Sequence, residues 1–357
     1  MRKSSLLATA ALASAAVVML AGCSSSGGGT ESASGDAASA GRACVILPDA
    51  KSSPRWENFD HKYLEEGLTA AGFEVDIQNA QGDVNKYSTI ADQQLTKGCG
   101  VMLLVDYQGA AEAVATKAKA EGIPVVAYDR PFTGADYYVS FDNVKVGEME
   151  GQTVLDGLKA AGKDPASAVV VYMGGDPTDG NAKMFHDGAV KVMEAAGIKP
   201  AAEPPGVWDQ AKSQTNFEQA LTSLGGKVDG AWVANDTNAA GVIKVLQDNN
   251  LKGVAVSGQD ANVAGLQNIL LGWQTATVYK PVKSEAAAAT ATAVALLKGD
   301  KPEAGAKLDD GTPYIQVTPI LVGPGQVKDV IAAGDAAYSD VCTADVKAAC
   351  DANGVTQ

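Results

Sequence analysis

An acidic residue and an arginine stand together where an apolar segment of this 357-residue chain ends. Asp129 and Arg130 follow the apolar residues 125–127, which come after Gly122-Ile-Pro. A carboxylate accepts hydrogen bonds and a guanidinium donates them in a fixed fork, so the two groups together can satisfy both halves of a sugar diol. Ligands of open α/β sheets bind at the carboxyl ends of the strands. We therefore predict a polyol-binding site at this point of the chain.

Other polar and aromatic residues occupy the same position relative to predicted strands, and few of them suit ordinary packing. The candidate ligand-binding residues are Arg55, Trp56, Asp129, Arg130, Asn181, Lys183, Trp208, Asn235, Asp260 and Lys280. Sugar hydroxyls both donate and accept, while the C–H faces of the ring stack on aromatic side chains, so a sugar requires this mixture. Trp56 and Trp208 could sandwich one sugar ring between them.

The elements that must position these residues alternate between apolar strands and amphipathic helices. Strands are predicted at 44–47, 74–78, 101–105 and 124–127, with helices at 55–71, 84–97 and 109–121; the alternation resumes at 143 and continues to a helix at 282–297. This pattern predicts two doubly wound parallel-sheet α/β lobes. We expect a first lobe at 43–142 plus 281–313, a second at 143–280 plus 314–340, a three-segment hinge between them, and a tail at 341–357.

The amino terminus has the features of an export signal. Arg2 and Lys3 precede an apolar run at 6–20, which ends in Leu20-Ala-Gly-Cys23. This ending resembles a bacterial lipobox, which implies that 1–23 is a lipoprotein signal peptide, cleaved before Cys23, with lipidation of the Cys23 thiol and anchoring to the cell membrane from outside. Residues 24–42 are rich in Ser, Gly and Ala, which is typical of a flexible tether. A transmembrane helix is the alternative, but the run is shorter than the ~20 residues that a span needs.

Four further cysteines predict disulfides, since exported proteins meet an oxidising environment. Cys44 opens the first predicted strand and Cys99 precedes the third, and these strands are neighbours in a sheet of order 2-1-3. We expect Cys44 to pair with Cys99, and Cys342 with Cys350. A metal site built from the four is the alternative, but the chain has no paired Cys-x-x-Cys spacing.

Composition and motifs exclude several classes of function. A formal net charge of −14 argues against nucleic-acid binding, which requires clustered Lys and Arg. We expect no cofactor, no metal and no catalytic residue, because phosphate-loop, nucleophile-elbow and His-Glu-x-x-His motifs do not occur. A glycoside hydrolase using Asp129, Asp260 and Glu148 is an alternative. A carboxylate beside Arg or Lys stays ionised, however, and makes a poor proton donor.

Seven motifs resemble the D-xylose-binding proteins of bacterial ABC importers. They are Arg55-Trp, Ala127-Tyr-Asp-Arg, Tyr138-Val-Ser-Phe-Asp-Asn-Val-Lys-Val-Gly-Glu, Met173-Gly-Gly-Asp-Pro-Thr-Asp-Gly-Asn-Ala-Lys, Ala234-Asn-Asp, Ser257-Gly-Gln-Asp-Ala and Thr277-Val-Tyr-Lys-Pro. The resemblance covers about residues 44–320 and implies a type 1 periplasmic binding protein fold, a pentose site built from the candidate residues and delivery of sugar to an ABC permease. The chain departs from the family at Lys51-Ser-Ser-Pro-Arg55, with a single arginine, and at Gly180, where a second Asn is common.

The resulting hypothesis is a monomeric, lipid-anchored protein that captures an aldopentose, with D-xylose favoured. Its alternatives are binding of glucose, galactose or arabinose, and a sensor that presents its closed form to a receptor. The missing DNA-binding head and the export signal exclude a transcriptional regulator. Asp142 and Asp236 are expected to cap helices, and His61 and His186 to be surface or packing residues.

Overall fold

The computed structural model describes residues 41–356. The predicted signal at 1–23, the lipidated Cys23 and the tether up to residue 40 lie outside these residues. The first strand begins at Arg42, the last residue assigned to the tether. Within the described part of the chain, no helix is both long and apolar enough to cross a membrane.

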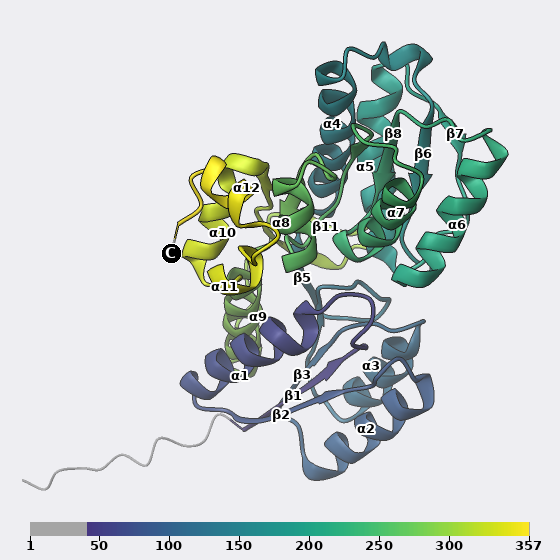
Figure 1. Ribbon diagram of the computed structural model, residues 1–357. Helices are drawn as coiled ribbons and strands as arrows, with labels where there is room; N and C mark the ends of the chain where they lie inside the picture. The colour runs from purple at the N-terminus through teal and green to yellow at the C-terminus, as the bar shows by residue number, and fades with distance from the viewer. Residues whose placement is uncertain (1–40, 357) are drawn as a thin grey trace, which may run out of the picture. The chain divides into compact units, whose positions relative to one another are not determined.

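A seven-stranded sheet forms the first lobe (Figure 1). Its strands, in spatial order, are β11 (Ala306–Lys307), β12 (Pro313–Val317), β5 (Tyr137–Phe141), β4 (Val125–Tyr128), β3 (Val101–Leu104), β1 (Arg42–Leu47) and β2 (Glu74–Asn79). All neighbouring pairs are parallel except β11 with β12. Val45 of β1, for example, lies between Ile77 of β2 and Leu103 of β3. The order β2-β1-β3 is the strand order on which the predicted Cys44–Cys99 bridge depends.

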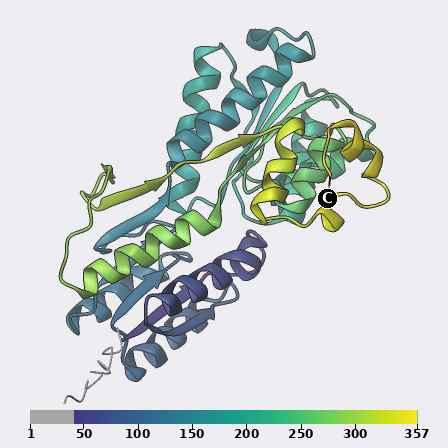
Figure 2. The same ribbon diagram turned by 90° about the vertical axis from the view of Figure 1, so that its left-hand side faces the viewer.

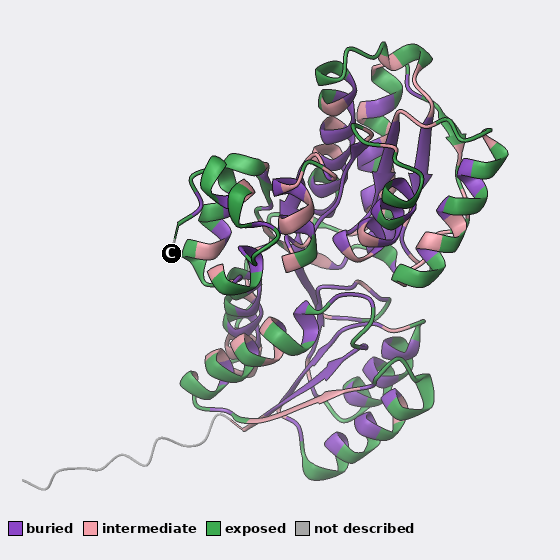
Figure 3. Ribbon diagram, viewed as in Figure 1, coloured by how far each residue is buried: buried purple, intermediate pink, exposed green. Residues whose placement is uncertain are grey.

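Helices cover both faces of this sheet, which explains why its central strands are apolar throughout. The helices α1 (His61–Ala70) and α9 (Val282–Leu297) pack on one face, and α2 (Val84–Lys97) and α3 (Ala110–Ala120) on the other. Strand β1 shows the alternation: Val45 and Leu47 join the core under α1 and α9, whereas Cys44 and Ile46 join the core under α2 and α3. Figure 3 shows β1 and β3 buried within the lobe.

The second lobe repeats this design around a four-stranded parallel sheet. Its order is β7 (Pro200–Ala202), β6 (Val170–Met173), β8 (Gly230–Val233) and β9 (Ala255–Val256). The helices α4 (Asn143–Ala160) and α5 (Gly180–Ala195) cover one face, and α6 (Gln210–Ser223) and α7 (Asp236–Asp248) cover the other. The two-lobed, doubly wound α/β architecture predicted from the sequence is therefore confirmed.

Side-chain caps fix the start of most helices that follow a strand. The capping residues are Asp83, Asp142, Asp179, Asp209, Asn235 and Asn262, each accepting a hydrogen bond from a backbone N–H in the first turn. The prediction for Asp142 is confirmed. The prediction for Asp236 is wrong, because Asn235 caps α7 and the Asp236 carboxylate turns into the protein.

The chain crosses between the lobes three times. It passes from β5 to α4, from β10 (Thr277–Tyr279) to α9, and from β12 to β13 (Ile320–Val322), which pairs with β10. Figure 2 shows β12 running beside β5 toward the second lobe. The assignment of residues 314–317 to the second lobe is wrong. They belong to β12, whose backbone pairs with β5 in the first sheet, so the third crossing lies near residue 318.

Residues after β13 form a small helical segment on the second lobe. It contains η3 (Pro324–Gln326), α10 (Val327–Ala333), α11 (Tyr338–Val341) and α12 (Lys347–Ala352). Their apolar side chains share one core with β10 and with α8 (Val263–Leu270). Two shorter turns, the π-helical η1 (Trp56–Asp60) and the 3₁₀ η2 (Pro165–Ser167), complete the secondary structure of residues 41–356.

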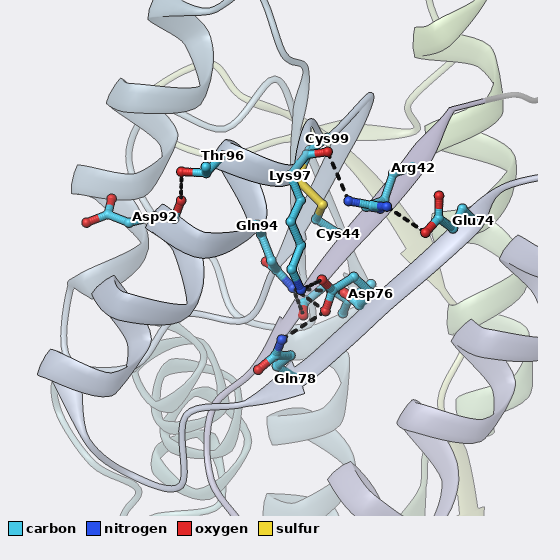
Figure 4. Close-up of a disulfide and its surroundings, with 11 residues drawn as sticks. Arg42, Cys44, Glu74, Asp76, Gln78, Asp92, Gln94, Thr96, Lys97 and Cys99 are labelled. Carbon is cyan, nitrogen blue, oxygen red and sulfur yellow. Dashed lines mark hydrogen bonds and ion pairs between the residues drawn. A yellow bond between two sulfur atoms is a disulfide. The ribbon is translucent and has the colours of Figure 1, made fainter.

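Both predicted disulfides are present. Cys44 and Cys99 are bridged with a Cα–Cα distance of 5.8 Å, and Cys342 and Cys350 with one of 6.0 Å. Figure 4 shows the first bridge beside Arg42, whose guanidinium donates to the Lys97 carbonyl. A chain-entropy estimate gives ~4 kcal/mol for the closure by Cys44 and Cys99, against ~2.5 kcal/mol for the shorter loop.

Candidate functional site

A small pocket of about 30 Å³ lies between the two lobes. It is lined by Ser52, Ser53, Arg55, Trp56, Asp129, Arg130, Asp179, Asn181, Phe185, Trp208, Asn235, Gln259, Asp260 and Lys280. These residues follow strands of both sheets, as expected for an α/β binding site. Nine of the ten predicted residues are in the lining. This volume is well below the ~300–1,000 Å³ typical of ligand pockets.

Lys183 is the predicted residue that the structure places elsewhere. Its side chain is 78% exposed and pairs with Asp187 on the surface of α5. Asn181, two residues earlier, faces the pocket, and consecutive helical residues are about 100° apart, so Lys183 points roughly the opposite way. Phe185 comes four residues after Asn181 and does reach the pocket. The helical period therefore predicts that Phe185, and not Lys183, shares the pocket-facing side of α5 with Asn181.

Arg55 is held in the first lobe by three buried carboxylates. Its guanidinium donates to Asp60 at 2.7 and 2.9 Å, to Asp129 at 2.9 Å, and to Glu285 on α9. Burial disfavours its charge, but the three carboxylates outweigh that effect and raise the pKa of Arg55. Because its side chain is only 5% exposed, Arg55 is a fixed donor in the wall of the pocket.

Asp129 remains an ionised acceptor in this cluster. Burial raises its pKa, but the positive charges of Arg55, Lys280 and Arg130 outweigh burial and bring the pKa below its usual value. Its backbone is left-handed, with φ of +60°, a conformation that a non-glycine residue adopts at a cost of order 1–3 kcal/mol. The backbone amide of Asp129 stays paired with the Val139 carbonyl at 2.9 Å.

Asp129 and Arg130 do not form the mutual pair that their adjacency predicts. Asp129 pairs with Arg55, whereas Arg130 pairs with Asp179 of the second lobe at 3.1 Å and donates to the Ser52 hydroxyl at 3.0 Å. Adjacent side chains leave the backbone in different directions, so each has found a different partner. Both still line the same pocket, one as acceptor and one as donor.

Amide side chains of the second lobe bond directly to the backbone of the first. Asn181 donates to the Asp129 carbonyl at 2.8 Å, and its oxygen accepts from Tyr138 at 2.6 Å. Asn235 donates to the Ser52 carbonyl at 3.0 Å while its own oxygen caps α7. These bonds hold both amides, each at most 4% exposed, at the junction of the lobes.

The remaining charged pair lies at the hinge end of the pocket. Lys280 follows β10 and pairs with Asp260 at 3.0 Å. Burial disfavours the Lys280 charge, but Asp260 and Asp129 outweigh it and raise the pKa of Lys280. The pocket therefore contains a fixed ammonium donor beside two carboxylate acceptors.

The two candidate tryptophans differ in their surroundings. Trp56 is 2% exposed. The guanidinium groups of Arg55 and Arg130 lie over its ring, 4.7 and 5.2 Å from the ring centroid. Trp208 is half-buried, donates from Nε1 to Asp179 at 3.1 Å and meets Phe185 edge to face. Both rings line the pocket from opposite lobes. The sandwich itself stays a prediction.

Sequence reasoning left five lining residues out of its candidate set: Ser52, Ser53, Asp179, Phe185 and Gln259. Asp179 had a recognisable signal, because an Asp immediately before a helix marks a cap at a strand-end loop. Ser52 and Ser53 adjoin Arg55 in sequence, but serines are common in loops and give no such signal.

Of the three carboxylates considered for glycoside hydrolysis, Asp129 and Asp260 line the pocket and Glu148 does not. Glu148 lies on the outer surface of α4, bonded to Lys191 at 2.7 Å and to Lys145 at 3.1 Å, so it cannot oppose Asp129. The lowered pKa of Asp129 also makes it a poor general acid. Among residues 41–356 no cluster of His, Cys, Asp and Glu could hold a metal ion.

Comparison with known proteins gives consistent matches over most of the chain. The family model described as "Periplasmic binding protein domain" matches residues 44–301. The D-xylose-binding periplasmic protein of Escherichia coli (strain K12) is 34% identical over 289 residues, which cover 78% of this chain and 85% of that protein. The multiple sugar-binding periplasmic receptor ChvE of Rhizobium radiobacter is 28% identical, over 84% of this chain and 91% of that protein.

A solved structure shares the fold. An ABC transporter solute-binding protein from Clostridium phytofermentans, with β-D-glucose bound, superimposes with a TM-score of 0.75 and 25% sequence identity. The match covers 84% of this chain and 99% of that protein. The two-lobed architecture is therefore that of periplasmic binding proteins of type 1.

Proposed function

Because the chain belongs to the periplasmic binding protein domain family, we propose that it is the extracytoplasmic sugar-binding component of an ABC importer. It captures a monosaccharide, with D-xylose favoured, closes its lobes around the ring and delivers the sugar to the permease subunits. A lipid on Cys23 anchors it to the cell membrane, and it acts as a monomer without cofactor, metal or catalysis.

The observation that carries the proposal is the composition of the interlobe pocket. It combines fixed donors from Arg55, Arg130 and Lys280 with the carboxylate acceptors Asp129 and Asp260. A neutral sugar can hydrogen-bond to both kinds of group. An anionic ligand would be repelled by the two carboxylates, and a cationic ligand would be repelled by the three basic groups.

The choice of D-xylose is supported by the 34% identity to the Escherichia coli protein named for that sugar. A different monosaccharide is the second candidate, and a particular observation favours it. The Clostridium phytofermentans protein binds β-D-glucose on the same fold, and the Rhizobium radiobacter receptor is named for multiple sugars. A sensor that presents the closed form to a receptor would use the same pocket.

A calorimetric sugar panel tests the proposal. The purified exported protein is titrated with D-xylose, L-arabinose, D-ribose, D-glucose, D-galactose and xylitol. We expect the tightest binding for D-xylose, with a change in tryptophan fluorescence that depends on Trp56 or Trp208. If a hexose binds most tightly, the proposed ligand changes from D-xylose to that hexose. If no sugar of the panel gives a heat of binding, the proposed sugar-binding function is wrong.

A further inference from the structure

A fully buried carboxylate lies behind the wall of the pocket and does not line it. Asp236 is the first residue of α7 and has no exposed surface. Its oxygens accept hydrogen bonds from the Gln274 amide at 2.7 Å, from the Thr277 hydroxyl at 2.9 and 3.0 Å, and from the Asn262 backbone at 3.1 Å. One carboxylate thus joins α7, β10 and the start of α8.

These partners surround the loop that carries two pocket residues, Gln259 and Asp260. The Asp236 amide donates to the Gln259 carbonyl at 3.0 Å, directly beside the pocket. Glycines leave room for the carboxylate: a Cβ on Gly258 or on Gly265 would lie 2.3 Å from an Asp236 oxygen. The Asp236 carboxylate is therefore packed closely between the backbone at Gly258 and the backbone at Gly265.

The same loop has an unfavourable backbone conformation. Asp260 has φ of +95° and Ala261 has φ of +53°, in a region where residues other than glycine are strained. Such a conformation persists only when the surrounding contacts impose it. The Asp236 hydrogen bonds to Asn262 and Thr277 are contacts of this kind, and Asp260 must hold this conformation to pair with Lys280.

We propose that Asp236 is a positioning residue, which holds Gln259 and Asp260 in the conformation that binds sugar and makes the sugar affinity depend on its own ionisation. This inference rests on the proposed function. Asp236 itself touches no ligand. It acts through the loop at 258–262, so its removal should weaken binding without removing any group from the pocket.

Ionisation matters because the partners of Asp236 are mainly donors. The Gln274 Nε2 group and the Asn262 N–H donate to the carboxylate and cannot accept from it, so the ionised form suits them better than the protonated acid. Charged groups on neighbouring elements are Asp260 on the loop, Glu150 on α4 and Lys280, which neutralises Asp260. Burial and the Asp260 charge raise the pKa of Asp236 to about 7, against the lowering effect of the Gln274 hydrogen bond.

The experiment compares Asp236→Asn with wild type by titrating the purified exported protein with D-xylose across a pH series. We expect wild-type affinity to rise with pH through about 7. In Asp236→Asn the sugar affinity should fall by about tenfold or more, because the NH2 of the new amide can face a donor of the protein. The sugar affinity of this variant should also be independent of pH through this range.

If Asp236 served only the stability of the fold, the sugar affinity would instead follow the stability as the pH changes. A carboxyl whose pKa is raised on folding contributes stability that is lost as pH rises through the folded value, so stability and affinity should change in opposite directions.

The matched control is Asp329→Asn, since Asp329 also lies in the first turn of a helix but is exposed. It should keep both the affinity and the pH profile of wild type. If Asp236→Asn does not fold, Thr277→Val removes the hydroxyl donor without a change of charge and should weaken binding in the same direction. Wild-type affinity and pH profile in a folded Asp236→Asn protein would overturn the inference. Absence of sugar binding by the wild type would instead overturn the proposed function.

Discussion

At the scale of single residues, the pocket depends on charged side chains that are held in place by ion pairs within the protein. Arg55 is paired with three carboxylates, Arg130 with Asp179, and Lys280 with Asp260. Fixed donors and acceptors reduce the entropy lost on binding and penalise a ligand whose hydroxyls do not match, since an unpaired buried polar group costs about 1–3 kcal/mol.

Replacing Asp129 with Ala should weaken sugar binding by about 2–5 kcal/mol, because the change removes an ionised acceptor and leaves buried positive charge without its partner. Calorimetry of the folded variant measures the loss. His186→Ala is the control, since His186 lies on the surface beside Glu203. Equal affinities for Asp129→Ala and wild type would show that Asp129 does not bind the sugar.

Arg55 should also be important for folding. Arg55→Met leaves the carboxylates of Asp60, Asp129 and Glu285 buried without their cation, and we expect a loss of about 3–5 kcal/mol in the free energy of unfolding. Arg42→Met breaks an ion pair to Glu74, whose side chain is 68% exposed, and a hydrogen bond to the Lys97 carbonyl, and should cost about 1–2 kcal/mol. Denaturant unfolding compares them. Similar losses in the two variants would contradict this account of the cluster.

At the scale of elements, the close contact of α4 with α5 positions the second-lobe wall of the pocket. Glycines allow it: a Cβ on Gly188 would lie 2.1 Å from the Val144 carbonyl oxygen, and one on Gly147 would lie 2.0 Å from the Phe185 carbonyl oxygen. Helix α5 begins at the pocket and carries Asn181 and Phe185 into it. Any separation of the two helices therefore moves both side chains.

Gly188→Ala should lower stability by about 1–3 kcal/mol through overpacking, and should also weaken sugar binding by displacing α5. Gly305→Ala is the control, because a Cβ there meets no atom within 4 Å. Thermal unfolding and calorimetry of both variants provide the measurements. A Gly188→Ala protein as stable and as tight-binding as the control would mean that the helices adjust without cost.

At the scale of the whole described chain, the pocket exists only where both lobes contribute. Asn181, Asn235 and the Arg130–Asp179 pair link the lobes around it. A link also exists away from the pocket, where Tyr63 of α1 donates to Asp335 of the carboxyl-terminal segment at 2.8 Å. A ligand that contacts both lobes must favour the arrangement in which all its contacts are made.

Sugar should therefore draw the lobes together, and solution scattering should record a smaller radius of gyration when D-xylose is added. Asn235→Ala removes a direct bond between the lobes and should reduce the decrease that sugar causes. His186→Ala again serves as control. A radius of gyration that grows on addition of saturating sugar would contradict closure.

Features that depend on local sequence pattern could be predicted before the structure was known. Alternating strands and amphipathic helices predicted two α/β lobes, and the strand-end positions of residues such as Asp129 and Asn235 predicted where the pocket would form. The same sheet order predicted the Cys44–Cys99 bridge. The prediction of two lobes is confirmed because strand and helix periodicity is encoded over a few neighbouring residues.

Which side chains meet became clear from the three-dimensional structure. It brought Asp60, Asp129 and Glu285 around Arg55, gave Asp129 and Arg130 different partners, turned Lys183 to the surface, and placed β12 in the first sheet. Such pairings depend on side-chain direction and on the packing of segments up to 230 residues apart, which local sequence does not encode.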